Sequence, residues 1–219
     1  MTDTPTVAVR GEAFLEVEPE LAEVTVTVGA RGSDREETLR RLAERAETLR
    51  GLLDGYAEAI ERRETSRVHV YPELKRSGER VRAYTGSVST AVTFSDFTRL
   101  GDVVLALADA EQTTVYGPAW SLRPDSAAYA EARRAAIDDA LGRAREYAGA
   151  LGARLVRLIE LTDSGLAGQR GPRPMAMAAR VDAFGGAPAP PQLDLDPQRQ
   201  TVHAAVEARF AISEPTVLG

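Results

Sequence analysis

Few side chains in this chain of 219 residues could take part in catalysis or metal binding. The chain contains two histidines, His69 and His203, a single lysine, Lys75, and no cysteine. Without cysteine there is no disulfide, thiolate metal site or cysteine nucleophile. The two histidines could hold a metal ion together with carboxylates, but they lack the HxH or HxxxH spacing that prepares such a site. Each lies between apolar residues of a strand pattern, so we predict that both point outward from a sheet as ordinary surface residues.

The local motifs of the common enzyme classes are absent from the sequence as well. It contains no GxSxG nucleophile elbow, no Walker phosphate loop and no GxGxxG. Lys75 lies in a predicted turn, and the glycines at 168–171 and 185–186 lie in a proline-rich stretch rather than between a strand and a helix. We therefore predict no catalytic, cofactor-binding or metal-binding residue, no cofactor and no enzymatic activity.

The charge balance bears on the partners of the protein. The 27 Lys and Arg residues face 33 Asp and Glu residues, for a net charge of −6, which argues against nucleic acid because such binders need a basic surface. No stretch approaches the ~18 consecutive apolar residues of a membrane span. The first five residues have no apolar segment of the kind found in signal peptides. These features predict a cytoplasmic protein that neither binds nucleic acid nor spans a membrane.

Helices and strands position these side chains, and the spacing of apolar residues predicts where in the sequence they lie. We predict three helices, which begin at Ser33, Ser95 and Pro124; the first ends near Gly55 or runs on to about Ile60. The predicted strands are Thr6–Glu18, Ala22–Val28, Ser66–Tyr71, Val81–Phe94, Thr113–Leu122, Arg154–Leu161 and Val202–Ile212. The order is ββαββ followed by αβαββ, which indicates an α+β fold with a mixed, mainly antiparallel sheet and helices packed on it.

Local signals add detail to these elements. The first two strands, separated at Pro19, are predicted to form a hairpin. Ser33 and Glu36 have the spacing of a capping box, and a change of parity within 81–94 predicts a bulge near Gly86. The third helix carries an unbroken i,i+4 ridge of small residues, which would let it approach a neighbouring element closely: Ala128, Ala132, Ala136, Ala140, Ala144 and Ala148.

The segment Thr162–Gln200 before the last strand has a different composition. It holds six of the 12 prolines and five of the 18 glycines, and a long stretch of this kind in a compact domain is normally functional or disordered. We predict a flexible insert. Its apolar side chains at Met175, Met177, Val181 and Phe184 could form an assembly arm that docks into a neighbouring subunit of a homo-oligomer. A disordered, tolerated insertion is the alternative.

A series of different short motifs extends from Val7 to Ile212, over nearly the whole chain. They are Val17-Glu-Pro19-Glu20-Leu-Ala22, Val70-Tyr-Pro72, Ala83-Tyr84-Thr-Gly-Ser87, Phe94-Ser-Asp96, and the helix Ala132–Ala140 with Leu151-Gly152. In order and spacing they resemble the SIMPL-domain family, which includes bacterial periplasmic immunogenic and stress-associated proteins. The chain departs from the family in having Pro19-Glu20 where Pro-Asp is frequent, and in lacking the export signal that many members carry.

The resemblance implies a single SIMPL-like domain over residues 6–213, with a division into lobes 6–94 and 95–213 as an option. The family has no accepted catalytic residues, so the resemblance assigns none. Its members are linked to oxidative or envelope stress and to oligomeric assembly, and an animal member to a kinase partner.

Three functions are compatible with these observations. The first is a non-enzymatic assembly or binding module, with a stress-related role. The second is an antioxidant or metal-dependent enzyme with an unrecognised site, resting on methionine oxidation or on a metal at His69 and His203. The third is a kinase-linked signalling adaptor, which rests on the family resemblance alone.

Overall fold

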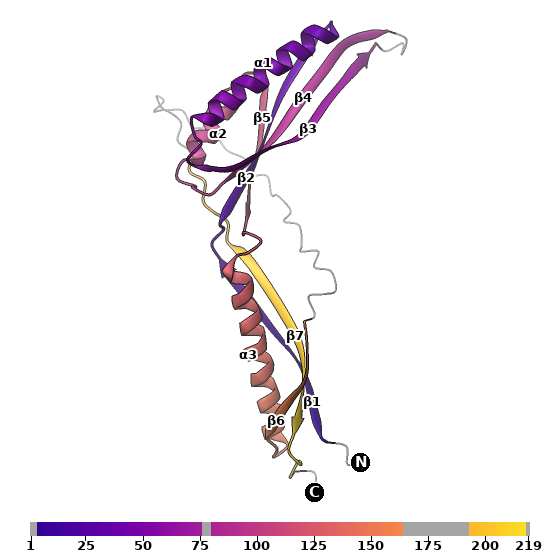
Figure 1. The fold of residues 1–219 in the computed structure, drawn as a ribbon, viewed down its shortest axis with the longest axis vertical. Coiled ribbons are helices and arrows are strands. Elements are labelled where there is room, and N and C mark those ends of the chain that lie inside the picture. Colours follow the sequence, from indigo (N-terminus) through magenta and orange to yellow (C-terminus); the bar gives the residue numbers. More distant parts are fainter. Residues whose placement is uncertain (1–3, 76–79, 164–192, 218–219) are drawn as a thin grey trace, which may run out of the picture. The chain divides into compact units, whose positions relative to one another are not determined.

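The computed structural model of the protein describes residues 4–75, 80–163 and 193–217. The described residues form an α+β fold with the predicted order of elements, ββαββαβαββ (Figure 1). The bounds are β1 (Thr6–Val17), β2 (Leu21–Gly32), α1 (Arg35–Asp54), β3 (Ile60–Leu74), β4 (Val81–Phe94), α2 (Leu100–Ala108), β5 (Thr113–Ser121), α3 (Ala127–Ala150), β6 (Leu155–Asp163) and β7 (Gln200–Ile212).

The described residues divide into two compact units. The three-stranded unit comprises residues 4–17, 124–163 and 199–217, and the four-stranded unit comprises residues 18–75, 80–123 and 193–198. The division does not fall between residues 94 and 95, where the sequence suggests two lobes. Strand pairing explains the difference, because β1 pairs with β7 from the far end of the chain.

The predicted N-terminal hairpin is wrong. β1 pairs with β7 along its whole length, from Thr6 opposite Ala211 to Val17 opposite Gln200, whereas β2 lies between β4 and β5 in the other sheet. A break at Pro19 permits either arrangement, and alternation along a strand does not identify its partner. The expected mixed sheet is likewise replaced by two sheets in which every described pairing is antiparallel.

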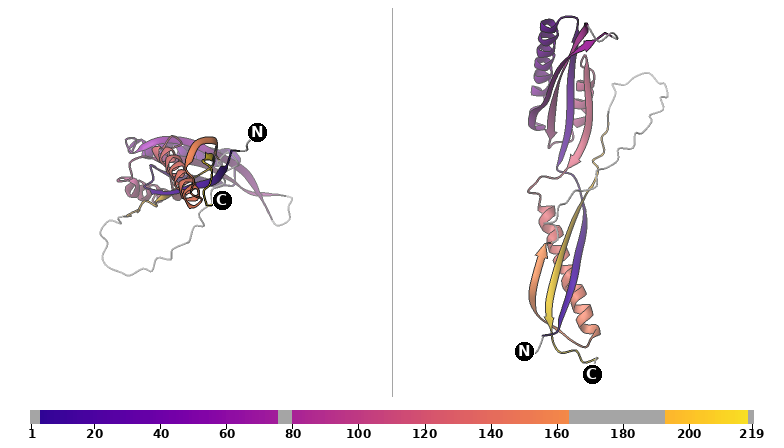
Figure 2. Two further views of the ribbon diagram at one scale, coloured as in Figure 1. Left: turned by 90° about the horizontal axis from the view of Figure 1, so that it is seen from below. Right: turned by 90° about the vertical axis from the view of Figure 1, so that its right-hand side faces the viewer.

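The three-stranded unit has the strand order β1-β7-β6, with α3 along one face (Figure 2). The helix contacts β1 and β7 extensively and β6 barely. The side chains of β7 that face the helix alternate with those of the opposite face, which we call the outer face. The helix-facing set is buried: Val202, Ala204, Val206, Ala208, Phe210 and Ile212.

The alanine ridge of α3 brings the helix unusually close to β1, as predicted. All six ridge alanines are buried, and they face the stretch of β1 around Gly11. A Cβ atom at Gly11 would lie 2.0 Å from the carbonyl oxygen of Ala136 and 2.7 Å from the Cβ of Ala140. The helix can therefore lie at this distance only because position 11 has no side chain.

Polar contacts fix the register and the ends of α3. The backbone N–H of Glu12 donates to Asp139 Oδ2 at 2.9 Å, and this bond, followed by the side chain of Arg143, lowers the pKa of Asp139. Ser126 caps the N-terminus by accepting from the N–H of Ala128. Gly152 follows the helix with a φ of 68°, which is the left-handed conformation of a glycine stop signal.

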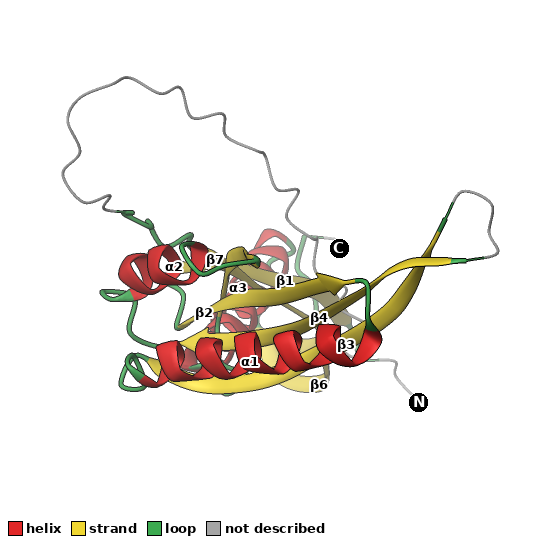
Figure 3. Cartoon of the chain, turned by 90° about the horizontal axis from the view of Figure 1, so that it is seen from above, coloured by secondary structure: helices red, strands yellow, loops and turns green. Residues whose placement is uncertain are grey.

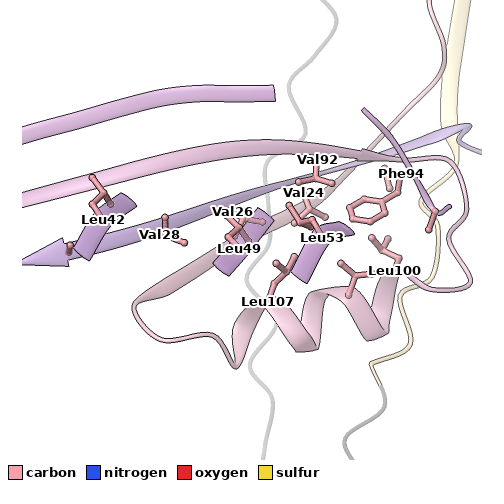
Figure 4. Packing of buried hydrophobic residues seen from close by; sticks show 14 residues of the cluster. Val24, Val26, Val28, Leu42, Leu49, Leu53, Val92, Phe94, Leu100 and Leu107 are labelled. Atoms are coloured by element: carbon pink, nitrogen blue, oxygen red, sulfur yellow. The ribbon is translucent and has the colours of Figure 1, made fainter. Parts of the chain in front are cut away.

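The four-stranded unit has the strand order β3-β4-β2-β5. Helix α1 runs alongside the strands (Figure 3), and its leucines share one cluster with the valines of β2 and the leucines of α2 (Figure 4). The fully buried members of this core are much larger than alanine: Phe94, Leu53, Leu100, Leu107, Val24, Val26, Val92 and Val103. This unit is thus stabilised by burial of large side chains rather than by close backbone approach.

Several predicted boundaries in this unit are wrong by a few residues. Asp34, not Ser33, caps α1, because its carboxylate accepts from the N–H of Glu37. Helix α2 begins at Leu100 rather than at Ser95. Strand β3 extends well beyond the predicted 66–71 and contains Pro72, which an edge strand tolerates because one side makes no ladder bonds.

The bulge expected near Gly86 lies elsewhere. Gly86 pairs regularly with Ala30 and Val70, and the register of β3 against β4 shifts instead where Glu73 and Leu74 face Ala83 and Val81. Gly86 lies beneath helix α1, since a Cβ there would be 2.9 Å from a methyl carbon of Leu42.

The end of the Pro/Gly-rich segment packs on its own chain. Leu195 contacts the core of the four-stranded unit, and a Cβ at Gly101 of α2 would lie 2.1 Å from the carbonyl oxygen of Leu193. Residues 193–198 therefore do not belong to an arm that reaches a neighbour. The four predicted arm residues, Met175, Met177, Val181 and Phe184, lie outside the described residues.

The same change, from glycine to alanine, at Gly11 and at Gly142 tests the close approach of α3 to β1. Gly11→Ala should destabilise the protein by at least the ~1–3 kcal/mol typical of overpacking, because the new methyl group meets helix backbone. Gly142→Ala, in the middle of α3, should stabilise it by about 0.5–1 kcal/mol, since no atom lies within 4 Å of that Cβ and alanine favours a helix over glycine. Urea unfolding of both variants measures the change in the free energy of unfolding. Changes of the same sign in the two variants would show that β1 does not lie on the alanine ridge.

Candidate functional site

The two histidines lie in separate units and in different surroundings. His69 is exposed on β3, with its ring 5.1 Å from that of Tyr71. His203 is on the outer face of the three-stranded sheet, opposite Phe14, and the two rings stack at 4.4 Å. His69 is thus the surface residue that the sequence predicts, whereas His203 is half-buried, and its Nε2 atom is buried without a hydrogen-bond partner in the described part of the chain.

Ligand clusters for a metal ion do not form among residues 4–75, 80–163 and 193–217, where no three His, Asp or Glu side chains come together. Lys75 is exposed at the end of β3, and its N–H donates to the carbonyl of Arg80, in keeping with the predicted turn.

The most organised polar cluster spans three strands of the four-stranded unit. Arg31 of β2 binds Glu73 of β3 with Nε–O distances of 3.0 and 3.2 Å and an Nη2–O distance of 2.7 Å. Thr85 of β4 donates to the same carboxylate at 2.6 Å. These two side chains lower the pKa of Glu73 to about 2. A carboxyl group held ionised in this way is a poor general acid at neutral pH, so the cluster links strands rather than forming an active site.

Each unit has a shallow hollow lined in part by charged side chains. The first, of about 270 Å³, is bounded by α1, β3 and β4 and includes Arg50 and Arg63, whose guanidinium groups pair with Glu47 and Asp54. The second, of about 360 Å³, lies on the outer face of the three-stranded sheet between Arg10, Glu160 and Arg209. Both are open and lined by mixed charges, and neither is lined by a histidine.

The aromatic residues around Gly117 also divide between core and surface. Trp120 packs edge-on against Phe97, with ring centroids 4.9 Å apart, as part of the core of the four-stranded unit. Tyr116 is exposed on β5, at the edge of the sheet.

Exposed apolar side chains are concentrated on β6, at one edge of the three-stranded sheet. Four of them lie in the run from Val156 to Leu161, with exposed fractions of 63% for Val156, 50% for Leu158, 41% for Ile159 and 45% for Leu161. Among the described elements β6 has a sheet neighbour, β7, on one side, and α3 hardly covers its face. An apolar edge strand of this kind is a template for pairing with another chain.

Sequence reasoning missed this edge as a candidate site, although a signal was present. The run 154–161 reads as a near-continuous apolar strand, which is the pattern of a strand buried on both faces. Whether the neighbours exist to bury it depends on sheet order, which local periodicity does not determine.

The Glu73 cluster predicts a dependence of stability on pH. Because folding lowers the pKa of Glu73 from its ordinary value of 4.5 to about 2, its contribution is fully present above about pH 4.5 and is lost as the pH falls toward 2. Glu73→Gln should therefore lower the melting temperature most near pH 7, and the difference from wild type should shrink below pH 4.5. Thermal melts from pH 7 to pH 2 measure this, with Glu58→Gln in the exposed turn after α1 as control; a constant difference would contradict the assignment.

His203 allows a second stability test. An unpaired buried polar atom costs about 1–3 kcal/mol, so His203→Phe, which keeps the stacking on Phe14 and removes the nitrogen, should leave stability unchanged or raise it. His203→Ala should lower stability because the stacked ring is lost. A destabilised His203→Phe in urea unfolding would mean that the nitrogen has a partner in solution.

Comparisons with curated proteins and with solved structures do not reveal a close relative. No curated protein matches the sequence significantly. A solved structure, that of the uncharacterized protein TM1266 from Thermotoga maritima, matches 46% of this chain and 98% of its own at 17% identity, with a TM-score of 0.25, and its likeness is too low to support any argument. No helix in the described part of the chain is long and apolar enough to cross a membrane.

The match to a family model is far more extensive. Residues 7–210 match the model named SIMPL, described as a protein of unknown function (DUF541). The match runs from β1 into β7 and so includes both units and the β6 edge. The chain therefore belongs to the SIMPL family.

Proposed function

We propose that this protein is a non-enzymatic module that acts by assembling with other protein chains. The observation that carries the proposal is the apolar edge at β6, where side chains from Val156 to Leu161 are about half exposed. Hydrophobic groups on the surface of a stable protein are normally scattered, and a contiguous group on an edge strand marks an interaction site.

The polar side chains support the same proposal. Two carboxylates with a lowered pKa, Glu73 and Asp139, already have structural partners. Glu73 is held by Arg31 and Thr85, and Asp139 accepts a hydrogen bond from the backbone N–H of Glu12. Interaction proteins need no such groups to be free, because their affinity comes from buried apolar surface and main-chain hydrogen bonds.

A double variant that replaces two of the exposed side chains of β6 tests the proposal. In the double variant Leu158→Lys/Leu161→Lys the two leucines are replaced on the face that α3 hardly covers. We expect wild-type protein to behave as an assembly in light scattering and the double variant to form a smaller species with an unchanged circular dichroism spectrum. Tyr147→Lys, at a residue of α3 that is 55% exposed, is the matched control and should keep the wild-type mass.

Two outcomes would contradict the proposal. One is a wild-type protein that is monomeric at high concentration and retains no partner from native extract. The other is an enzymatic activity that survives in the double variant, which would show that the function does not depend on this edge.

A further inference from the structure

We propose that β6 pairs with β6 of a second copy of this chain, antiparallel, about a twofold axis between Leu158 and Ile159. The inference rests on the proposed assembly function and names its partner and register. It starts from an irregularity of β6: the register against β7 shifts between Leu155 and Arg157 and again between Leu158 and Glu160.

The second irregularity places two opposite charges on one face. Arg157 lies opposite Ala211 and Glu160 opposite Arg209, and these β7 residues have the same parity, on the outer face. In a regular strand, residues three apart point to opposite faces. The extra residue between Leu158 and Glu160 therefore brings Arg157 and Glu160 to the same side of the sheet.

A twofold axis perpendicular to the sheet makes these charges complementary. Such an axis continues the sheet through two antiparallel β6 strands and keeps each outer face on the same side. With the axis between Leu158 and Ile159, Arg157 of each copy faces Glu160 of the other, so two opposite-charge pairs flank the centre. If the axis moves by half a residue or one residue, each charge faces an uncharged side chain instead.

The same register pairs the apolar side chains. Leu158 faces Ile159 of the second copy, and Val156 faces Leu161, so the four exposed side chains of each strand meet apolar partners. Edge strands that avoid such pairing carry prolines or several like charges, and β6 has neither. The other edge, β1, instead presents several outer-face charges near Arg10, Glu12 and Glu16.

Charge reversal tests this register without removing apolar surface. In Arg157→Glu each Glu160 would face a glutamate, and in Glu160→Arg each Arg157 would face an arginine. Each variant alone should self-associate at least about 10-fold more weakly than wild type, because two attractions become two repulsions. Mixed one to one, the two variants should associate with each other, because both pairs are then of opposite charge.

The mixture also controls for folding. A variant that had lost its fold would not associate with the other. Arg145→Glu, on the exposed surface of α3, makes the same charge change away from β6 and should keep the wild-type mass. Analytical ultracentrifugation over a range of concentrations measures the wild type, the three variants and the mixture. A mixture no tighter than either variant alone would overturn the inference.

The absence of cysteine permits a direct test of the register. Arg157→Cys and Glu160→Cys should each remain uncrosslinked alone, since like positions lie about three residues, or roughly 10 Å, apart across the axis. A mixture of the two should form a disulfide-linked dimer, because directly opposed positions fall in the range that a disulfide spans. Crosslinking of either variant alone, or none in the mixture, would contradict the register.

The failures of the two proposals are distinguishable. A wild-type protein that assembles, with charge variants that keep its full mass, would reject the β6 pair while leaving the assembly function intact. A monomeric wild-type protein would reject both.

Discussion

The contact between a glycine and a row of alanines determines how the three-stranded unit is built. Gly11 allows the backbone of β1 to lie against Ala136 and Ala140 with no side chain between them. A helix with such a narrow buried ridge gains dispersion contacts from closeness rather than from large side chains. It also reaches little beyond the strands directly beneath it, and so α3 covers β1 and β7 but hardly β6. The uncovered edge follows from the same constraint that holds the unit together.

In the four-stranded unit, larger side chains pack the helices against the sheet. Leu49, Leu53 and Leu107 fill the space between helices and sheet together with Val26 and Phe94. A core of this kind tolerates some variation in distance, since leucine and phenylalanine side chains can adapt to the gap. The polar link of Arg31, Glu73 and Thr85 joins three of its strands. The two units therefore differ in how strictly sequence dictates the distance between a helix and its sheet.

Local patterns in the sequence predicted the elements well and their partners poorly. The alanine ridge of α3 and the order of the elements follow from the types and spacing of neighbouring residues, so they could be predicted directly. The pairing of β1 with β7 depends on residues nearly 200 positions apart in the chain, and alternation carries no information on that choice. The exposure of β6 could not be predicted for the same reason, because it depends on which strand stands at the edge.

The pairing of the first strand with the last has a consequence for synthesis of the protein. The elements α1, α2 and β2–β5 are complete once residue 121 has been made, and their contacts are mostly within this stretch. β1 is made first, yet its partner β7 ends at Ile212. On the ribosome β1 must therefore remain without its strand partner until the residues of β7 have emerged. Of the described strands, β1 is therefore translated before all the others and is among the last to find its partner.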